Sequence, residues 1–306
     1  MDIKRGFIET GKWYKGNTHS HTIISDGNLN PQELKELYKS DGYSFLTITD
    51  HRVYGVHEDL NEKDFIILPG VELDRSEGWL RPGGYTFCDH IVGIGLPGEN
   101  TFEHGYKFTY DPQKLSAMDI VDLLKENGNV AIYAHPIWSH KRMEEMDELT
   151  GILGLEIYNN NCHIDCFAGH ADSYLDRLLW DGKEAFCFAA DDTHRAHDAL
   201  GGYIVVKAEE LTHEAIMDSI LKGSFYASNG PEIKDFYIED NVAYLECSPC
   251  VAIGFSSDSC VGGGSGPYRG LIEKSHYPVY KTDSYVRAFC MDEKGNKAWT
   301  QPIWVK

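Results

Sequence analysis

The sequence predicts an α/β fold followed by a small all-β domain, from two observations. Up to about residue 225, apolar runs of strand length alternate with segments of helical periodicity, as in βαβ units with parallel strands. Beyond this point, short alternating runs replace the helical pattern, which is typical of antiparallel strands. We therefore predict an α/β domain over residues 1–228 and an antiparallel β domain over residues 229–306.

The first predicted unit is a strand, a helix and a second strand. Residues 15–22 form the first strand, and Asn30-Pro31 begins the helix because proline is favoured in a first helical turn. Asp41-Gly42 ends this helix. Residues 43–49 are strongly apolar, as expected for a strand buried on both faces, and run into Asp50-His51. This unit predicts a parallel pair of strands.

The same alternation continues along the chain. Further strands are predicted at residues 64–68, 130–134, 152–157, 185–190 and 202–207. A β-hairpin is predicted at 83–95, and helices at 116–127, 170–182 and 212–222. In the tail, strands are predicted at 233–238, 242–247, 251–255, 285–289 and 299–304.

Composition limits the classes of partner. The 306 residues carry a net charge of −20, from 28 basic and 48 acidic residues, which disfavours stable binding to a nucleic-acid duplex. A small anionic substrate held by bound cations remains compatible with this charge. The sequence contains no apolar run of about 18 residues and no apolar segment of a signal peptide. We therefore expect a cytoplasmic protein with no membrane contact, a small-molecule substrate, and a tail domain suited to packing or to homo-oligomer formation.

His19, His21 and Asp26 are the first candidate metal ligands. Alternate side chains of a strand share a face, so His19 and His21 point the same way, and the Ser-Asp-Gly turn that follows can return Asp26 toward them. Two histidines alone are weak evidence, because such pairs also occur at surfaces and in hydrogen-bonded cores.

Similar residues recur at the carboxyl ends of the predicted strands. In a closed α/β barrel these ends share one face, which holds the active site. Imidazoles and carboxylates suit Zn, Mn or Fe, and one metal takes three or four protein ligands, so the set predicts two or three divalent ions. Glu72 is the expected bridging carboxylate because it follows a sharp Pro-Gly turn. The candidate ligands are His19, His21, Asp26, His51, Glu72, His90, His135, Asp192 and His194.

Seven separated motifs resemble those of the PHP (polymerase and histidinol phosphatase) family of metal-dependent hydrolases, in the family's order over residues 15–225. This resemblance implies a distorted (βα)7 barrel with a multinuclear site on its carboxyl-terminal face. Asp26 stands where histidinol-phosphatase-like members have a histidine, which resembles the nucleotide-phosphatase-like branch. The motifs are His19-Ser-His21-Thr, Ser25-Asp26-Gly27, Thr49-Asp50-His51, Pro69-Gly70-Val71-Glu72, Asp89-His90, Ala134-His135-Pro136 and Asp191-Asp192-Thr193-His194.

The resemblance also implies how the ligands divide among metals, and to which branch the tail belongs. Asn229-Gly-Pro231 and residues 298–303 are similar to the tail of stand-alone PHP hydrolases grouped with carbaryl hydrolases. The implied ligand sets are His19, His21, Glu72 and Asp192 for one metal, Glu72, His90 and His135 for a second, and Asp26, His51 and His194 for a third.

Such a site predicts hydrolysis. Closely spaced metals lower the pKa of a bridging water and yield hydroxide near neutral pH, which attacks a phosphoester in line. Arg52 and Arg195 each follow a ligand histidine and are the preferred phosphate-binding candidates, with Glu72 and Asp192 as central carboxylates. Asp50 is expected to orient an imidazole, as is Asp191. The alternatives are a carbamate or ester hydrolase on the same metals, and a non-catalytic metal-binding module.

The cysteines receive a structural interpretation. Cys247-Ser-Pro-Cys250 is a CxxC pair without a second half, and Cys162 and Cys166 are likewise isolated. We interpret them as reduced, buried thiols and not as a zinc knuckle.

Overall fold

The computed structural model describes residues 3–81, 84–259, 262–266 and 270–306. The predicted strand–helix–strand unit is confirmed at the start of the chain: β2 (Lys12–Asn17), α1 (Pro31–Ser40) and β3 (Phe45–Thr47). β3 pairs in parallel with β2 and with β4 (Ile66–Leu68). Helix α1 begins with a capping box, in which the Asn30 side chain accepts from the Glu33 N–H at 3.0 Å.

These parallel strands form one end of a long mixed sheet. Among the described residues its order is β15-β14-β17-β18-β11-β10-β2-β3-β4, and β19 pairs with β17 outside this path. β10 is antiparallel to β2 and β11. The remaining strands are β10 (Tyr203–Ala208), β11 (Phe225–Ser228), β14 (Ala252–Ser256), β15 (Gly263–Ser265), β17 (Tyr285–Met291), β18 (Lys297–Thr300) and β19 (Ile303–Trp304).

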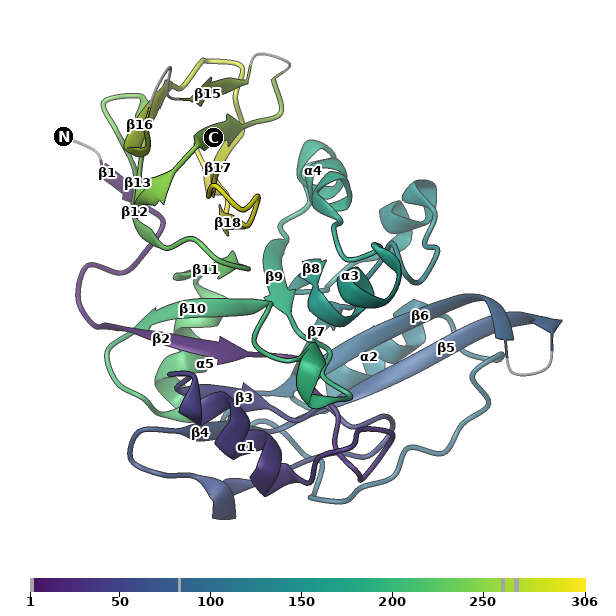
Figure 1. Cartoon of the computed structure of the whole chain (residues 1–306). Coiled ribbons are helices and arrows are strands. Elements are labelled where there is room, and N and C mark those ends of the chain that lie inside the picture. Colours follow the sequence, from purple (N-terminus) through teal and green to yellow (C-terminus); the bar gives the residue numbers. More distant parts are fainter. Residues whose placement is uncertain (1–2, 82–83, 260–261, 267–269) are drawn as a thin grey trace.

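A second sheet has the order β5-β6-β7-β8-β9. It begins with a long antiparallel hairpin, β5 (Gly70–Arg81) and β6 (Gly84–Gly95), which projects from the body of the molecule in Figure 1. The sequence predicted a hairpin at 83–95, but the hairpin begins earlier, at Gly70. Residue 83 lies outside the described residues. The other strands are β7 (Asn129–Tyr133), β8 (Gly154–Asn159) and β9 (Phe186–Ala190), of which β7–β8 and β8–β9 are parallel pairs.

The third sheet joins the beginning of the described chain to its tail. Its order is β1-β12-β13-β16, so β1 (Ile3–Arg5) pairs with β12 (Ile233–Glu239). The other members are β13 (Val242–Cys250) and β16 (Ile272–Pro278). The Lys4 Nζ also donates to the Trp304 carbonyl at 3.1 Å, so the two ends of the described chain lie close together (Figure 1).

Helices occupy the predicted segments, with one addition at the site. The predicted helices are α2 (Ala117–Glu126), α4 (Asp172–Trp180) and α5 (His213–Leu221), and the additional one is α3 (Asn160–Cys166), directly after β8. Short 3₁₀ turns are η1 (Glu58–Leu60), η2 (Met143–Glu148) and η3 (Ala196–Asp198).

The α/β class is confirmed, but the distorted (βα)7 barrel is not. The sheets are mixed, and the hydrogen-bonded strand orders of the described residues do not close into a ring. The physical reason is that several connections are hairpins, which place neighbouring strands antiparallel, whereas a parallel barrel needs a crossover at each step. The domain boundary near residue 228 stays a prediction. β11, which ends at this residue, pairs with β10 on one side and β18 on the other.

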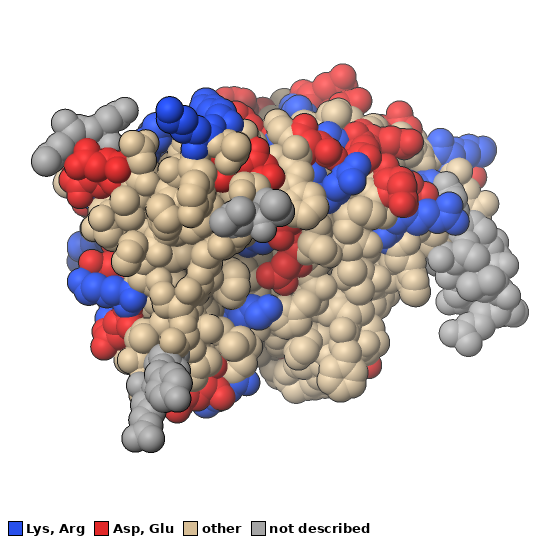
Figure 2. All heavy atoms as spheres, turned by 90° about the horizontal axis from the view of Figure 1, so that it is seen from above, with Lys and Arg blue, Asp and Glu red and all other residues tan. Residues whose placement is uncertain are grey.

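Three hydrophobic clusters hold these layers together. The largest lies under α2, α4 and α5 and includes Leu124, Leu175 and Ile216. A second fills the space between the tail sheets around Phe236, and a third packs α1 through Leu34. Figure 2 shows acidic and basic side chains interspersed around a broad area of other residues. In the described part of the chain, no helix is long and apolar enough to cross a membrane.

Candidate metal centre

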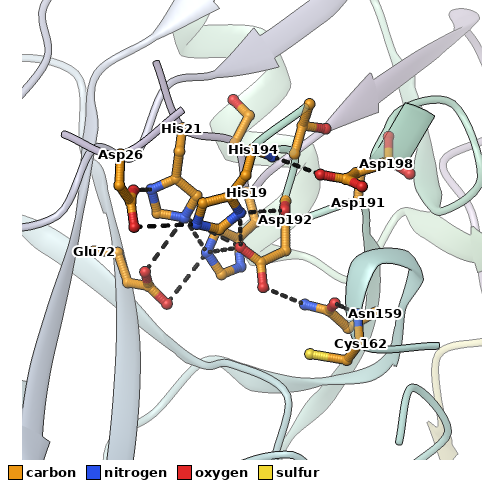
Figure 3. Close-up of polar contacts among 12 residues, drawn as sticks. His19, His21, Asp26, Glu72, Asn159, Cys162, Asp191, Asp192, His194 and Asp198 are labelled. Carbon is orange, nitrogen blue, oxygen red and sulfur yellow. Dashed lines mark hydrogen bonds and ion pairs between the residues drawn. The ribbon is translucent and has the colours of Figure 1, made fainter. Parts of the chain in front are cut away.

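The segment after β2 carries two histidines into the interior. The Asn17 side-chain carbonyl accepts from the His19 N–H at 3.1 Å. Beyond it, the main chain pairs with the segment after β9: the Asp192 N–H donates to His19 O at 3.0 Å, and the His21 N–H to Thr193 O at 2.8 Å. Both imidazoles are buried and face one space, with their Nε2 atoms 3.1 Å apart (Figure 3). This is the common direction that the spacing predicts.

Glu72 lies at the centre of the site. Its Oε1 is 2.9 Å from His90 Nδ1 and 3.2 Å from His19 Nε2, and its Oε2 is 3.0 Å from His51 Nδ1. The sequence predicted Glu72 just past the end of a strand, but it lies inside β5. His90 lies inside β6, within the segment predicted as a hairpin. The hairpin brings them together because these strands are paired: Glu72 is opposite Val92 and His90 is opposite Asp74.

Asp192 is the second central carboxylate. Its Oδ1 is 3.1 Å from His21 Nε2 and 3.3 Å from His19 Nε2, and its Oδ2 is 3.8 Å from His135 Nε2. Asp192 and His135 both have left-handed backbones, with φ of 55° and 27°. Such conformations are uncommon outside glycine and concentrate at functional sites, where the surrounding structure holds them.

A third group lies nearer the surface. Asp26 Oδ2 is 3.5 Å from His194 Nε2 and 3.6 Å from His51 Nε2, and Asp26 Oδ1 is 3.8 Å from His21 Nδ1. Asp26 is about half exposed, with a relative side-chain accessibility of 54%. The predicted turn therefore does return Asp26 toward the histidines.

All nine candidate ligands thus meet in one place, in overlapping groups. The grouping differs in three respects from the ligand sets implied by the resemblance. His51 approaches Glu72 and His90 as well as Asp26, His21 also joins the group of Asp26, and His135 groups with His19 and Asp192. The groups whose ligand atoms lie within 4.8 Å of one another are His21/Asp26/His51/His194, His19/His21/Glu72, His19/His135/Asp192 and His51/Glu72/His90.

The electrostatics of the site separate charged from neutral groups. Burial opposes ionisation of Glu72, but His90 and His19 outweigh it and lower the pKa of this carboxyl well below its usual range. Burial also opposes a charge on His19, yet the carboxylates of Asp192 and Glu72 raise its pKa well above the usual range. Burial, together with nearby His51, instead lowers the pKa of His21 to about 4. The site therefore keeps its central carboxylates ionised, as metal ligation requires.

Glu156 supports the site and was absent from the predicted set of ligands. Its Oε1 lies 2.7 Å from His19 Nδ1, and its Oε2 accepts from the Asn159 side chain at 2.8 Å and the His135 N–H at 3.1 Å. A carboxylate on the far ring nitrogen fixes the tautomer and orientation of a ligating histidine. Glu156 lies within β8, and an acidic residue in this otherwise largely apolar, buried strand was the available signal.

Asp50 and Asp191 hold loops and do not orient imidazoles, which corrects the expectation for both. Asp50 accepts from Thr22 Oγ1 at 2.7 Å and from Ser25 Oγ at 2.7 Å, and so fixes the segment that carries Asp26. Asp191 accepts from the Leu200, Gly201 and Gly202 N–H groups at 2.6–2.8 Å. These contacts involve short loops, which the sequence pattern does not place.

A cavity of about 470 Å³ opens above the ligands. His19 and His21 lie below its floor, whereas its walls add residues from α3 and from the segment after β7. Trp138 is 41% exposed, and its ring centroid is 4.9 Å from that of His135. The lining residues are Asp26, Asn28, His51, Glu72, His90, His135, Trp138, Asn161, Cys162, Asp165, Asp192, His194 and Arg195.

The two preferred arginines differ in placement. Arg195 lines the cavity, and its Nη2 lies 3.1 Å from both carboxylate oxygens of Asp165. Arg52 is not among the lining residues, and its guanidinium forms a two-point ion pair with Asp74 at 2.6 Å.

Comparisons with known proteins bear on the fold. No family model and no curated protein matches the sequence. Among solved structures, a two-domain protein from Bacteroides vulgatus, described as containing a predicted PHP-like metal-dependent phosphoesterase, aligns over 100% of this chain and 98% of its own, at TM-score 0.50 and 13% identity.

Two further structures cover less of the chain. An amidohydrolase from Chromobacterium violaceum covers 59% of this chain and 87% of its own, at 16% identity and TM-score 0.42. PsfC from Pseudomonas syringae covers 68% and 88%, at 12% identity and TM-score 0.44. The similarity to the Bacteroides vulgatus structure extends over the whole chain, and at 13% sequence identity it is evidence for the fold alone. The resemblance seen in the motifs is thereby confirmed at the level of the fold, which this chain shares with a PHP-like protein.

Proposed function

We propose that this chain is a metal-dependent hydrolase that releases phosphate from a small phosphorylated metabolite or nucleotide. The observation that carries the proposal is the convergence of nine imidazole and carboxylate side chains beneath one open cavity. Catalytic metal sites combine protein ligands with an open position, and a cavity directly above the ligands provides one.

The residues present fit divalent metal ions. Glu72 Oε2 and His21 Nδ1 are buried and have no partner in hydrogen-bonding geometry, even though His51 Nδ1 lies 3.0 Å from Glu72 Oε2. Buried polar atoms are costly to leave unpaired. The Nε2 atoms of His19 and His21 lie 3.1 Å apart and approach the same carboxylates. Cations between these groups would satisfy them, and a bridging role for Glu72 follows from its contacts with four or more imidazoles. We propose two or three ions, of Zn, Mn or Fe, held by these groups.

When bound, such ions supply Lewis acidity and an activated water as the nucleophile. The chain's own residues position the reaction. Glu156 fixes the His19 ring, and Asp50 fixes the segment carrying Asp26. Glu72 and Asp192 are proposed as the central carboxylates, and Arg195 as the residue that orients a phosphoryl group at the cavity wall.

Arg195 can act on the substrate only by changing partners. Its guanidinium contacts Asp198, which is fully buried, and Asp165, whose side chain is about half exposed. Ion pairs at exposed positions are weak, so the pair with Asp165 is the one that can be exchanged. A doubly charged phosphate would therefore compete effectively with Asp165 for two-point binding by Arg195.

A carbamate or ester hydrolase is the second candidate. Among the described lining residues, Arg195 is the one Lys or Arg, and its positive charge is already paired with the carboxylate of Asp165. A neutral substrate needs no further cation, and the exposed face of Trp138 offers it an apolar surface. The two candidates use the same metal centre and differ in what Arg195 does.

The deciding experiment combines elemental analysis with a substrate screen. We expect two or three equivalents of metal and metal-dependent phosphate release from phosphomonoesters or nucleotides. Turnover of aryl carbamates or esters alone, at the same metal content, would establish the second candidate. Less than one equivalent, with no turnover after Mn or Zn is added, would refute both and leave a non-catalytic module.

A further inference from the structure

A separate cluster of candidate ligands lies within the tail sheets. The Sγ atoms of Cys247, Cys250 and Cys290 all lie within 4.8 Å of one another, and all three side chains are fully buried. Within the described ranges, it is the one candidate metal group made of thiols alone. The sequence suggested that the CxxC pair is isolated, but the structure brings Cys290, from a strand much later in the chain, beside both of its cysteines.

An irregularity in β13 turns both cysteines of the pair toward the same layer. In a regular strand, residues three apart point to opposite faces. The pairing of β13 with β16 shifts register between Glu246 and Cys250, and burial changes phase there, since Cys247 and Cys250 are buried whereas Pro249 is exposed. Proline, which has no N–H to donate, is tolerated at such a bulge.

The third thiol comes from the facing sheet. Cys290 lies on β17, between β14 and β18, where it pairs with Ile253 and Ala298. The Val251 N–H donates to the Met291 carbonyl at 2.8 Å, which fixes the end of β13 beside β17. The three thiols thus span two hydrogen-bonded sheets, and an ion bound among them would link these sheets directly.

We propose that Cys247, Cys250 and Cys290 bind a thiophilic cation, with Zn²⁺ as the expected occupant. Thiolates select soft or borderline metals over Mg²⁺ and Ca²⁺. Zn–S bonds of about 2.3 Å require sulfur–sulfur separations of about 3.8–4.0 Å, which fit within the observed grouping. Each thiol releases its proton to solvent on binding. All three thiols are fully buried, so a substrate cannot reach an ion bound among them, and we propose a structural role and not a catalytic one.

The test is a Co²⁺ titration of the reduced, metal-depleted full chain in the absence of oxygen. Thiolate-to-cobalt charge transfer gives a near-ultraviolet band that the histidine and carboxylate centre does not produce. At saturation we expect the band intensity to correspond to one thiolate-bound Co²⁺ per chain, in addition to the ions taken up by the histidine and carboxylate centre. The band should disappear when Zn²⁺ is added. Because the band reports thiolates and not turnover, its result is independent of the proposed hydrolase function.

Variants sharpen the assignment. Cys290→Ala should lower the Co²⁺ affinity reported by this band at least about tenfold, since loss of a group that merely supports a ligand already costs about 10–100-fold. Cys187→Ala is the matched control, because Cys187 is also fully buried but belongs to another cluster, and it should leave the band unchanged.

Two results would overturn the proposal. One is the absence of a thiolate band in the wild-type chain, which does not depend on whether any variant folds. The other is loss of two hydrogens in the intact mass of the protein, with peptide mapping that places the bond among these three cysteines, if it persists under the reducing conditions of the titration. That result would indicate a disulfide between two of the cysteines.

Discussion

The candidate metal centre and the three-cysteine cluster differ in how they meet solvent. The first collects its ligands from loops and from a projecting hairpin, lies beneath an open cavity, and has Glu156 behind one of its ligands. The second lies between two sheets in an apolar core, without exposure. Catalytic metal sites keep a position open, whereas structural sites are closed. The same principle of convergent ligands thus supports two different roles within one chain.

The largest effect should come from the centre of the first site. Glu72→Gln should lower kcat/KM by more than about 100-fold and reduce the metal content, because a central carboxylate contributes more than a supporting residue, whose loss costs about 10–100-fold. Elemental analysis and phosphate release measure both. Glu58→Gln, at an exposed position, is the control. Full activity with full metal content in Glu72→Gln would show that Glu72 is not a metal ligand.

A smaller effect on activity is expected at Glu156, which contacts the candidate ligand His19. Glu156→Gln should lower metal affinity or kcat/KM by about 10–100-fold, because the amide no longer fixes the charge and tautomer of His19. Metal titration of the variant separates affinity from rate. Glu156→Asp should recover part of the loss, and equal defects in both variants at full metal content would indicate a packing role instead.

Substitution of Arg195, which lines the cavity, should have a smaller effect on activity still. Arg195→Ala should raise KM for a phosphorylated substrate by about tenfold, as expected for the loss of one charge-assisted contact. KM for a neutral ester should change little. Arg177→Ala is a matched control, because Arg177 also pairs with two aspartates at the surface. Arg52→Ala should have a smaller effect than Arg195→Ala, and the reverse order would restore Arg52 as the phosphate-binding residue.

Substitutions in the three-cysteine cluster should scarcely affect catalysis. Cys290→Ala should leave kcat/KM within about twofold, while a strong chelator should lower the Tm of the wild type more than that of the variant, because ligands that bind the folded state stabilise it. Activity assays and thermal melts with and without chelator measure these effects. A large loss of activity at normal Tm would contradict the division of roles.

Much of the first site could be predicted because its residues adjoin apolar runs. His19, His135 and Asp192 follow strands that the pattern identifies. Their proximity also depends on how two sheets meet, since β2 lies in a different sheet from β7 and β9. Glu72 was predicted past a strand end, whereas it lies inside β5, because the apolar pattern of this strand is interrupted by charged and polar residues.

What escaped prediction depends on register and on contacts distant in sequence. The closed barrel was not confirmed because strand periodicity does not reveal whether neighbouring strands are parallel. Cys290 joins Cys247 and Cys250 only through the packing of two sheets and a shift in register, neither of which leaves a motif. The loop-holding roles of Asp50 and Asp191 likewise depend on backbone N–H groups, which every sequence contains.

The pairing of β1 with β12 has a consequence for the order in which the chain folds. Residues 3–5 align with residues 237–239, so β1 must wait until the whole segment between them has been made before it finds its partner. Contacts so distant in sequence are slow to form. The β2–α1–β3 unit can assemble well before this pairing, whereas β1 stays without its neighbouring strand until β12 is available.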